Sequence, residues 1–197
     1  HRLALVPGIL AFLVTLVGGM LSALNIVSEK EIGTIEQIHV SPIKKSTFIL
    51  GKLIPFWILA NVAFTMGLLV SRFVYGIEIY GSLPLLYFFV GVYLLAILGF
   101  GLLISTYSET QQQAMFTIFF FMMIFIMMSG LYTPIESMPE WSQKLTLLNP
   151  LTYLIEVIRL IMLKNSGFKD LIPQFISILG MAVFFNFWAV WNYRKTS

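Results

Sequence analysis

Residues 119–128 read FFFMMIFIMM, ten consecutive apolar side chains inside a longer apolar stretch at 114–132. A β-strand that crosses a membrane alternates apolar and polar residues, whereas this run is apolar on every side. A helix of about 20 apolar residues crosses the roughly 30 Å of hydrocarbon in a bilayer. The stretch therefore predicts a membrane-spanning α-helix.

Four more apolar stretches of similar length lie on either side of it, at residues 3–27, 53–75, 83–105 and 171–191. The five windows contain a single charged residue, Arg72, close enough to a window end for its side chain to reach the headgroups. The whole chain is 58% hydrophobic and 11% charged, against about 25% charged in soluble domains. We expect an all-α membrane protein, a polytopic bundle of five transmembrane helices forming one domain over residues 1–197.

The residue types exclude several kinds of chemistry. The chain has no cysteine and two histidines, which leaves no thiolate or histidine metal site. Gly51-Lys52 is followed by Leu53 and not by Ser or Thr, so the phosphate-binding loop of nucleotide hydrolases is absent, as are the H-E-x-x-H and G-x-S-x-G motifs. We expect no catalytic residue, metal or cofactor in this chain, which is then not an enzyme by itself.

The polar connection at residues 28–52 contains the densest acidic cluster of the chain. Thr34 and Gln37 have the spacing of a helix capping box, and Pro42 ends the segment. Isoleucines recur in this segment at three-residue intervals, at Ile32, Ile35 and Ile38. The pattern predicts a short amphipathic helix beside the membrane, and the alternative is a solvated loop that contains His39.

The second long connection, residues 133–170, contains three prolines and then an apolar, helically spaced run from Leu151 to Lys164. A helix of about 14 residues is too short to span, so we expect it to be interfacial or re-entrant. Glu156 and Arg159 stand three positions apart and can pair, which lowers the cost of placing that face at the membrane's edge. The alternative is an ordinary ion pair on a surface helix.

Two further patterns concern the spans themselves. Gly18-Gly19 and the pair Gly99 and Gly101 are typical of close packing between helices. An adaptable apolar path for a substrate is a second hypothesis, and its candidate lining residues are Met122, Met123, Phe125, Met127 and Met128. Methionines that merely face lipid are an equally ordinary explanation.

The charge distribution leaves the orientation open. The net charge of +3 suits contact with anionic lipid, and the scattered lysines do not form a stripe for nucleic acid. Cytoplasmic loops are usually richer in lysine and arginine, but six of these residues fall on each side of the five predicted spans. The compactness of the 28–52 loop favours a cytoplasmic location for it.

Several segments in order resemble the permease subunits of ATP-binding-cassette exporters of the second, drug- and polysaccharide-exporting type. The segment EKEIGTIEQ at residues 29–37, followed by Ser41-Pro42, is similar to a cytoplasmic motif of that family. Similar motifs follow in the family's order: Ser105-Thr106, QQQAM at 111–115, SGLYTPIESMP at 129–139, NPLTY at 149–153 and Arg159. These motifs extend over almost all of the chain.

The resemblance implies a six-span permease that pairs with a second copy or a sister chain and receives two cytoplasmic ATPase subunits, which bind the ATP and Mg²⁺. The present residues would correspond to spans two to six, with the N-terminus outside and the C-terminus in the cytoplasm of an inner-membrane protein. The 28–52 connection becomes a cytoplasmic coupling helix, with contact residues Glu29, Lys30, Glu31, Gly33, Thr34, Glu36, Gln37 and Pro42. Residues 133–170 become an extracytoplasmic re-entrant segment that carries Tyr153, Glu156 and Arg159.

The implied function is multidrug-type efflux, in which a hydrophobic or amphipathic substrate (drug-like, lipid-like or glycan) moves outward by alternating access. Two alternatives belong to other classes. An ion-gradient transporter or channel usually buries ionisable groups at mid-membrane, and the windows contain none except Arg72 near a window end. A membrane scaffold that anchors an ATPase without transporting anything has no sequence feature against it.

Overall fold

The computed structural model describes residues 2–32, 45–79, 81–129 and 135–195. These residues form seven α-helices and two short 3₁₀ segments. In chain order they are α1 (Arg2–Ile32), α3 (Lys45–Phe73), α4 (Leu83–Tyr107), α5 (Gln111–Met127), η1 (Ile135–Ser137), α6 (Glu140–Thr146), α7 (Pro150–Lys164), η2 (Phe168–Leu171) and α8 (Ile172–Lys195). The expected all-helical membrane fold is confirmed.

Among these residues, four helical segments are long and apolar enough to cross a membrane: Val6–Ser28, Gly51–Phe73, Leu83–Tyr107 and Phe168–Asn192. The window at 114–132 coincides with α5, whose 17 residues are at the lower limit of about 17 for a spanning helix. A fifth span there therefore remains a prediction. α6 and α7 meet at a 74° bend, a geometry that suits either a re-entrant segment or one broken span.

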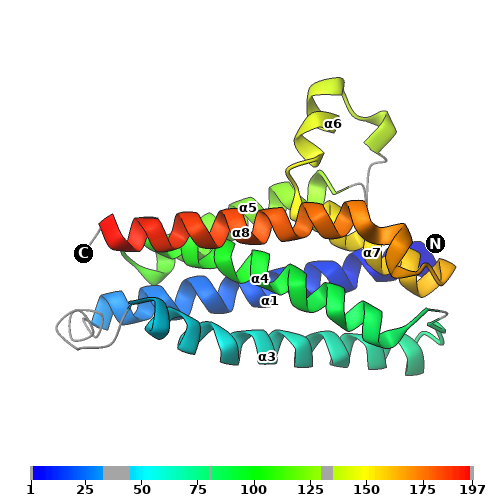
Figure 1. The fold of residues 1–197 in the computed structure, drawn as a ribbon, viewed down its shortest axis with the longest axis horizontal. Coiled ribbons are helices and arrows are strands. Elements are labelled where there is room, and N and C mark those ends of the chain that lie inside the picture. Colours follow the sequence, from blue (N-terminus) through cyan, green and yellow to red (C-terminus); the bar gives the residue numbers. More distant parts are fainter. Residues whose placement is uncertain (1, 33–44, 80, 130–134, 196–197) are drawn as a thin grey trace.

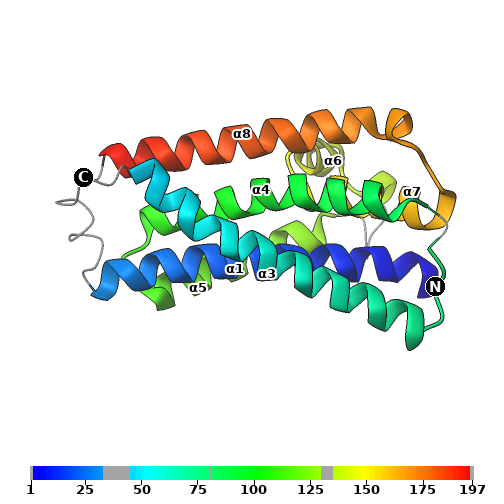
Figure 2. The ribbon, with the colours of Figure 1, turned by 60° about the horizontal axis from the view of Figure 1, so that its bottom comes forward.

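The five longest helices run side by side, and α4 lies among the others (Figure 1). α3 and α5 lie on opposite sides of α1 (Figure 1), and in the turned view α3 crosses in front of α1 (Figure 2). The start of α1, the α3–α4 connection, α7 and the start of α8 gather at one end, which we call the N-terminal end; α6 projects sideways from the bundle (Figure 1). The opposite end holds the end of α1, the start of α3 and the end of α8 (Figure 1).

Helix starts follow local capping signals. Ser82 accepts a hydrogen bond from the Leu85 backbone N–H at the start of α4, and Thr110 accepts one from Gln113 at the start of α5. Each bond satisfies one of the backbone donors that the first turn of a helix leaves free. These caps fix where the helices begin at the membrane surface.

Two helices extend beyond their predicted windows. α1 continues to Ile32, so that Glu29, Lys30 and Glu31 lie on its last turn, and α3 already begins at Lys45. Hydropathy marks only the apolar part of a helix, whereas Glu and Lys are good helix formers and allow the hydrogen-bond ladder to continue into the polar layer. α5 is shorter than its window and ends at Met127.

Close packing in the interior depends on glycines of α4. A Cβ added at Gly101 would lie 2.7 Å from the Gly19 carbonyl oxygen, and one at Gly99 would lie 2.5 Å from Nδ2 of Asn186. Both distances are shorter than carbon can approach such atoms. The packing role that the sequence predicts is therefore confirmed for Gly99 and Gly101. A Cβ at Gly18 would lie 3.1 Å from Cγ2 of Ile97, whereas one at Gly19 would make only ordinary contact, 3.5 Å from the Met122 side chain.

Three neighbouring helices each send one side-chain donor to a backbone carbonyl of α4. Ser22 of α1 bonds Leu98 O at 2.8 Å, Trp57 Nε1 of α3 bonds Gly91 O at 2.9 Å, and Asn186 Nδ2 of α8 bonds Leu95 O at 2.9 Å. In lipid such donors have no water to bond, and each interhelical bond contributes about 0.6 kcal/mol on average. The three bonds fix the rotation of α1, α3 and α8 about the central helix.

Candidate functional site

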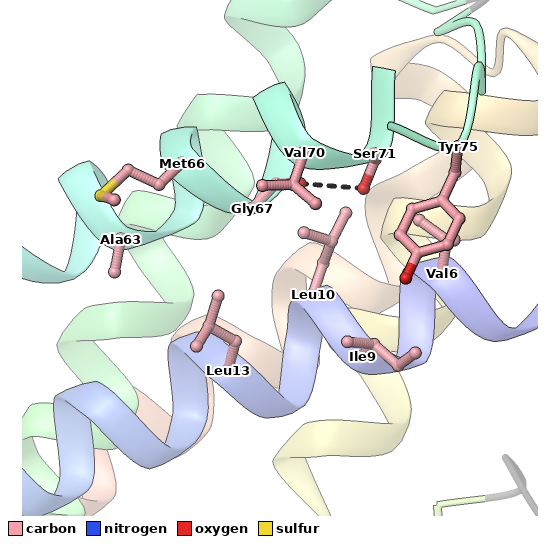
Figure 3. Close-up of a pocket in the computed structure, with 10 residues that line it drawn as sticks. All are labelled: Val6, Ile9, Leu10, Leu13, Ala63, Met66, Gly67, Val70, Ser71 and Tyr75. Atoms are coloured by element: carbon pink, nitrogen blue, oxygen red, sulfur yellow. Dashed lines mark hydrogen bonds between the residues drawn. The ribbon is translucent and has the colours of Figure 1, made fainter. Parts of the chain in front are cut away.

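An apolar hollow of about 640 Å³ lies between the first half of α1 and the second half of α3 (Figure 3). Ile9, Leu10 and Leu13 of α1 face Met66 and Val70 of α3 across it (Figure 3). We call it the α1–α3 groove. Its lining is almost entirely apolar, and Ser71 satisfies its own hydroxyl by donating to Gly67 O at 2.9 Å. The groove suits an acyl chain or another apolar molecule and offers no charged group to a hydrophilic ion.

An apolar stripe runs along α5, on the side of α1 opposite to α3. Its members are exposed and recur at helical spacing, and they are Phe116, Phe119, Phe120, Met123 and Met127. Of the predicted path residues, Met123 and Met127 belong to this stripe. Met122 is instead buried in the bundle, and the half-buried Phe125 packs its ring against Phe100 with 5.4 Å between centroids. Met128 is half-buried just after the helix.

The start of α7 is anchored by the segment NPLTY. The Asn149 side chain caps the helix by accepting from Leu151 N at 3.0 Å, and its amide donates to Phe125 O of α5 at 2.8 Å. Tyr153 donates to the Leu147 carbonyl at 2.6 Å, which ties α7 back to the end of α6. Tyr153 therefore holds the α6–α7 bend in place.

A second, polar hollow of about 420 Å³ lies between α7, η1 and the end of α5. Thr152, Glu156 and Arg159 of α7 line it, together with Glu136 of η1. Among the described side chains, Glu156 and Arg159 form no ion pair: Glu156 is exposed, whereas Nε of Arg159 is buried and has no hydrogen-bond partner. The i, i+3 spacing allowed the pair, but the two side chains, which both line the hollow, do not meet in an ion pair. Sequence reasoning missed Thr152 and Glu136 here.

The described part of the predicted coupling segment lies at the end opposite to the groove. Glu29, Lys30 and Glu31 are on the last turn of α1. Gly33, Thr34, Glu36, Gln37 and Pro42 lie outside the described residues, as does the capped helix predicted there. In the described ranges, no three His, Asp or Glu residues come together in a way that could hold a metal ion.

Comparison with known families decides the class of this chain. A family model described as "ABC-2 type transporter" matches residues 1–163. The chain belongs to this family. The resemblance drawn from the 29–37 segment and the later motifs is thereby confirmed, and this ABC-2 chain is a membrane-spanning, non-catalytic permease component.

Relatives of this ABC-2 chain are themselves described as permeases. The chain is 38% identical over 167 residues to the "Probable multidrug ABC transporter permease YbhR" of Escherichia coli K12, covering 85% of the chain and 45% of that protein. It is 32% identical over 185 residues to the "Probable multidrug ABC transporter permease YbhS" of the same strain, covering 92% and 48%. It is 28% identical over 192 residues to the "Inner membrane transport permease YhhJ", covering 96% and 51%. The ABC-2 chain thus spans about half the length of these relatives.

Proposed function

We propose that this chain is the translocating part of an ATP-driven exporter that moves hydrophobic or amphipathic compounds, drug-like, lipid-like or glycan, out of the cytoplasm or the inner leaflet. The observation that carries the proposal is the exposed Phe and Met stripe of α5. Flexible methionines and aromatic rings adapt to varied apolar partners. The names of two relatives, multidrug permeases, agree with such a substrate class.

The mechanism that we propose uses a second permease, either another copy or a sister chain, with the α5 stripes facing a shared path. Of the five predicted path residues, Met123 and Met127 would line this path, whereas Met122 is buried in the bundle and Phe125 and Met128 are half-buried. ATP and Mg²⁺ bind to separate ATPase subunits on the cytoplasmic side, and their closure shifts the paired bundles between inward-open and outward-open populations. The coupling segment at residues 28–52 receives that motion.

A matched pair of methionines tests whether the stripe or the groove meets the substrate. Met127 of the α5 stripe and Met66 of the α1–α3 groove are both 63% exposed. We expect Met127→Gln to raise the concentration of a lipid-like or drug-like stimulator needed for half-maximal ATPase activity about tenfold, because a polar amide in a dry apolar path costs about 1–3 kcal/mol. Met66→Gln should leave that concentration unchanged.

The measurement is ATP hydrolysis by the full-length permease reconstituted with its ATPase subunits. The same shift in both variants, or in Met66→Gln alone, would move the substrate path away from α5. Stimulation by polar metabolites and by no apolar compound would reject the substrate class, and a complex that no compound stimulates would favour the scaffold alternative.

We further propose that the N-terminus lies outside, that the C-terminus lies in the cytoplasm, and that the protein is in the inner membrane. The name of the relative YhhJ, an inner membrane permease, supports the compartment. Since the 197 residues contain no cysteine, single cysteines can report the orientation of each segment. We expect His39→Cys and Gln112→Cys to react with an impermeant maleimide only in inverted vesicles, and Glu140→Cys only in right-side-out vesicles. Labelling of position 140 from the cytoplasmic side would overturn this orientation.

A further inference from the structure

The polar hollow beside α7 contains polar atoms that lack partners. Oγ1 of Thr152 and Nε of Arg159 are both buried and make no hydrogen bond. More than about 90% of buried polar groups in proteins are hydrogen-bonded, and an arginine side chain is always charged. Both side chains line the same hollow, so a ligand with acceptor oxygens that enters it can satisfy these donors after a small side-chain rotation.

The geometry of α7 brings these donors together with carboxylates. Thr152, Glu156 and Arg159 follow one another at intervals of four and three residues, which places them on one face of the helix. Glu156 and Glu136 are both exposed where they line the hollow. The hollow thus has buried donors and carboxylates that reach solvent.

This arrangement selects among ligands by charge. A phosphate accepts well from a guanidinium, which can give it two parallel hydrogen bonds. A purely anionic ligand would be repelled by the carboxylates of Glu136 and Glu156. A ligand with a cationic group a few bonds from its phosphate would instead pair its cation with these two carboxylates. The complement of the hollow is a zwitterion with phosphate inside and ammonium outside.

We infer that this hollow binds the headgroup of an ethanolamine phospholipid. A primary ammonium offers three N–H donors to Glu136 and Glu156. A choline group has none and is usually recognised by aromatic rings, and none of the lining residues described here is aromatic. The volume of about 420 Å³ falls within the range of about 300–1,000 Å³ of small-molecule sites.

A lipid, and not a free aminophosphate, fits the surroundings of the hollow. Between η1 and α7 in the sequence, α6 and the α6–α7 connection carry exposed apolar side chains. The exposed fraction is 66% for Trp141, 62% for Leu147 and 70% for Leu148. Tryptophan is enriched at the level of lipid headgroups. Acyl chains can lie along these side chains while the headgroup enters the hollow.

The test measures lipid retention by the full-length permease in detergent, using native mass spectrometry with equimolar phosphatidylethanolamine, phosphatidylcholine and phosphatidylglycerol. We expect the wild type to retain phosphatidylethanolamine about tenfold better than the other two, as one lost charge-assisted hydrogen bond typically changes affinity by this factor or more. Arg159→Gln should abolish that preference. The matched control Arg72→Gln, an exposed arginine at the end of α3, should keep it.

Two further variants make the test independent of Arg159. Thr152→Val preserves the side-chain shape and should lower phosphatidylethanolamine retention several-fold, even where Arg159→Gln elutes abnormally on size exclusion. The double variant Glu136→Gln with Glu156→Gln should still retain phospholipid but no longer discriminate ethanolamine from glycerol headgroups. Glu109→Gln, an exposed glutamate beyond α4, is its control.

Three outcomes would overturn the inference. Equal retention of the three lipids by the wild type would mean that water alone fills the hollow. Unchanged preference in Thr152→Val and in the double variant would place the lipid elsewhere. Displacement of the lipid by an equal concentration of water-soluble phosphoethanolamine would assign the hollow to a free aminophosphate and not to a membrane lipid.

Discussion

Gly101→Leu is expected to destabilise the folded bundle strongly. A Cβ at position 101 would lie 2.7 Å from the Gly19 carbonyl oxygen and 2.9 Å from the Ser22 Cβ. The first of these atoms is backbone and cannot rotate away, so α1 and α4 would have to separate. Separation also breaks the Ser22 bond to Leu98 O. Overpacking typically costs about 1–3 kcal/mol, and backbone contact places this position at or above the upper end.

Gly180→Leu provides the matched control, because Gly180 also lies within a membrane-spanning helix but a Cβ there would meet nothing within 4 Å. The measurement is the melting temperature of the full-length permease in detergent, followed by size-exclusion chromatography after heating. We expect Gly101→Leu to lose about 10 °C or to give no monodisperse peak, and Gly180→Leu to match the wild type. Equal melting temperatures for the two variants would contradict the close approach of α1 and α4.

Charge reversal in the proposed coupling segment is expected to remove transport while leaving the membrane domain folded. Glu31 and Glu36 belong to the acidic cluster that we propose to dock the ATPase subunit. Losing one partner of a desolvated interfacial charge pair costs about 2–5 kcal/mol, and reversing its sign adds repulsion. We therefore expect Glu31→Lys and Glu36→Lys to lower transport by about tenfold or more.

The control for charge reversal is Glu78→Lys, at an exposed glutamate in the α3–α4 connection at the opposite end of the bundle. Co-purification of the ATPase and substrate transport should be measured for all three variants at equal expression. We expect Glu78→Lys to behave as wild type. Normal assembly and normal transport in both coupling variants would reject the docking role of residues 28–52.

The sequence predicts where the helices of this fold lie in the chain better than it predicts how each helix is rotated about its own axis. Hydropathy places α1, α3, α4 and α8, and the run from Leu151 to Lys164 predicts α7, because burial in lipid or against the bundle requires apolar side chains. It does not predict which face of a span meets another helix, since lipid and protein interior are equally apolar. The signal that could have helped is the single polar side chain in an apolar span, such as Ser22 or Asn186, each of which bonds α4.

The candidate sites also differ in how far the sequence predicts them. Glu156 and Arg159 stand out in the sequence because charged residues are rare in this chain. Their spacing predicts an ion pair between them. In the structure, however, Glu156 is exposed and Nε of Arg159 is buried, and the two side chains form no ion pair. The α1–α3 groove has no sequence signal, because its lining residues are indistinguishable from lipid-facing ones until two helices are placed side by side. Its existence depends on the angle between helices and not on residue type.

The unbroken length of α1 has a mechanical consequence. At about 1.5 Å per residue, its 31 residues form a rod of about 46 Å, which is longer than the hydrocarbon layer is thick. Glu29 and Glu31 sit near one end of this rod, and Ile9 and Leu10 of the groove lie near the other. A hydrogen-bonded helix transmits an axial push with little compression, so a displacement at one membrane surface arrives at the other at nearly full amplitude. Apart from Pro7 near its start, α1 continues as one helix from the groove to its charged last turn, so a single element joins the two ends of the bundle.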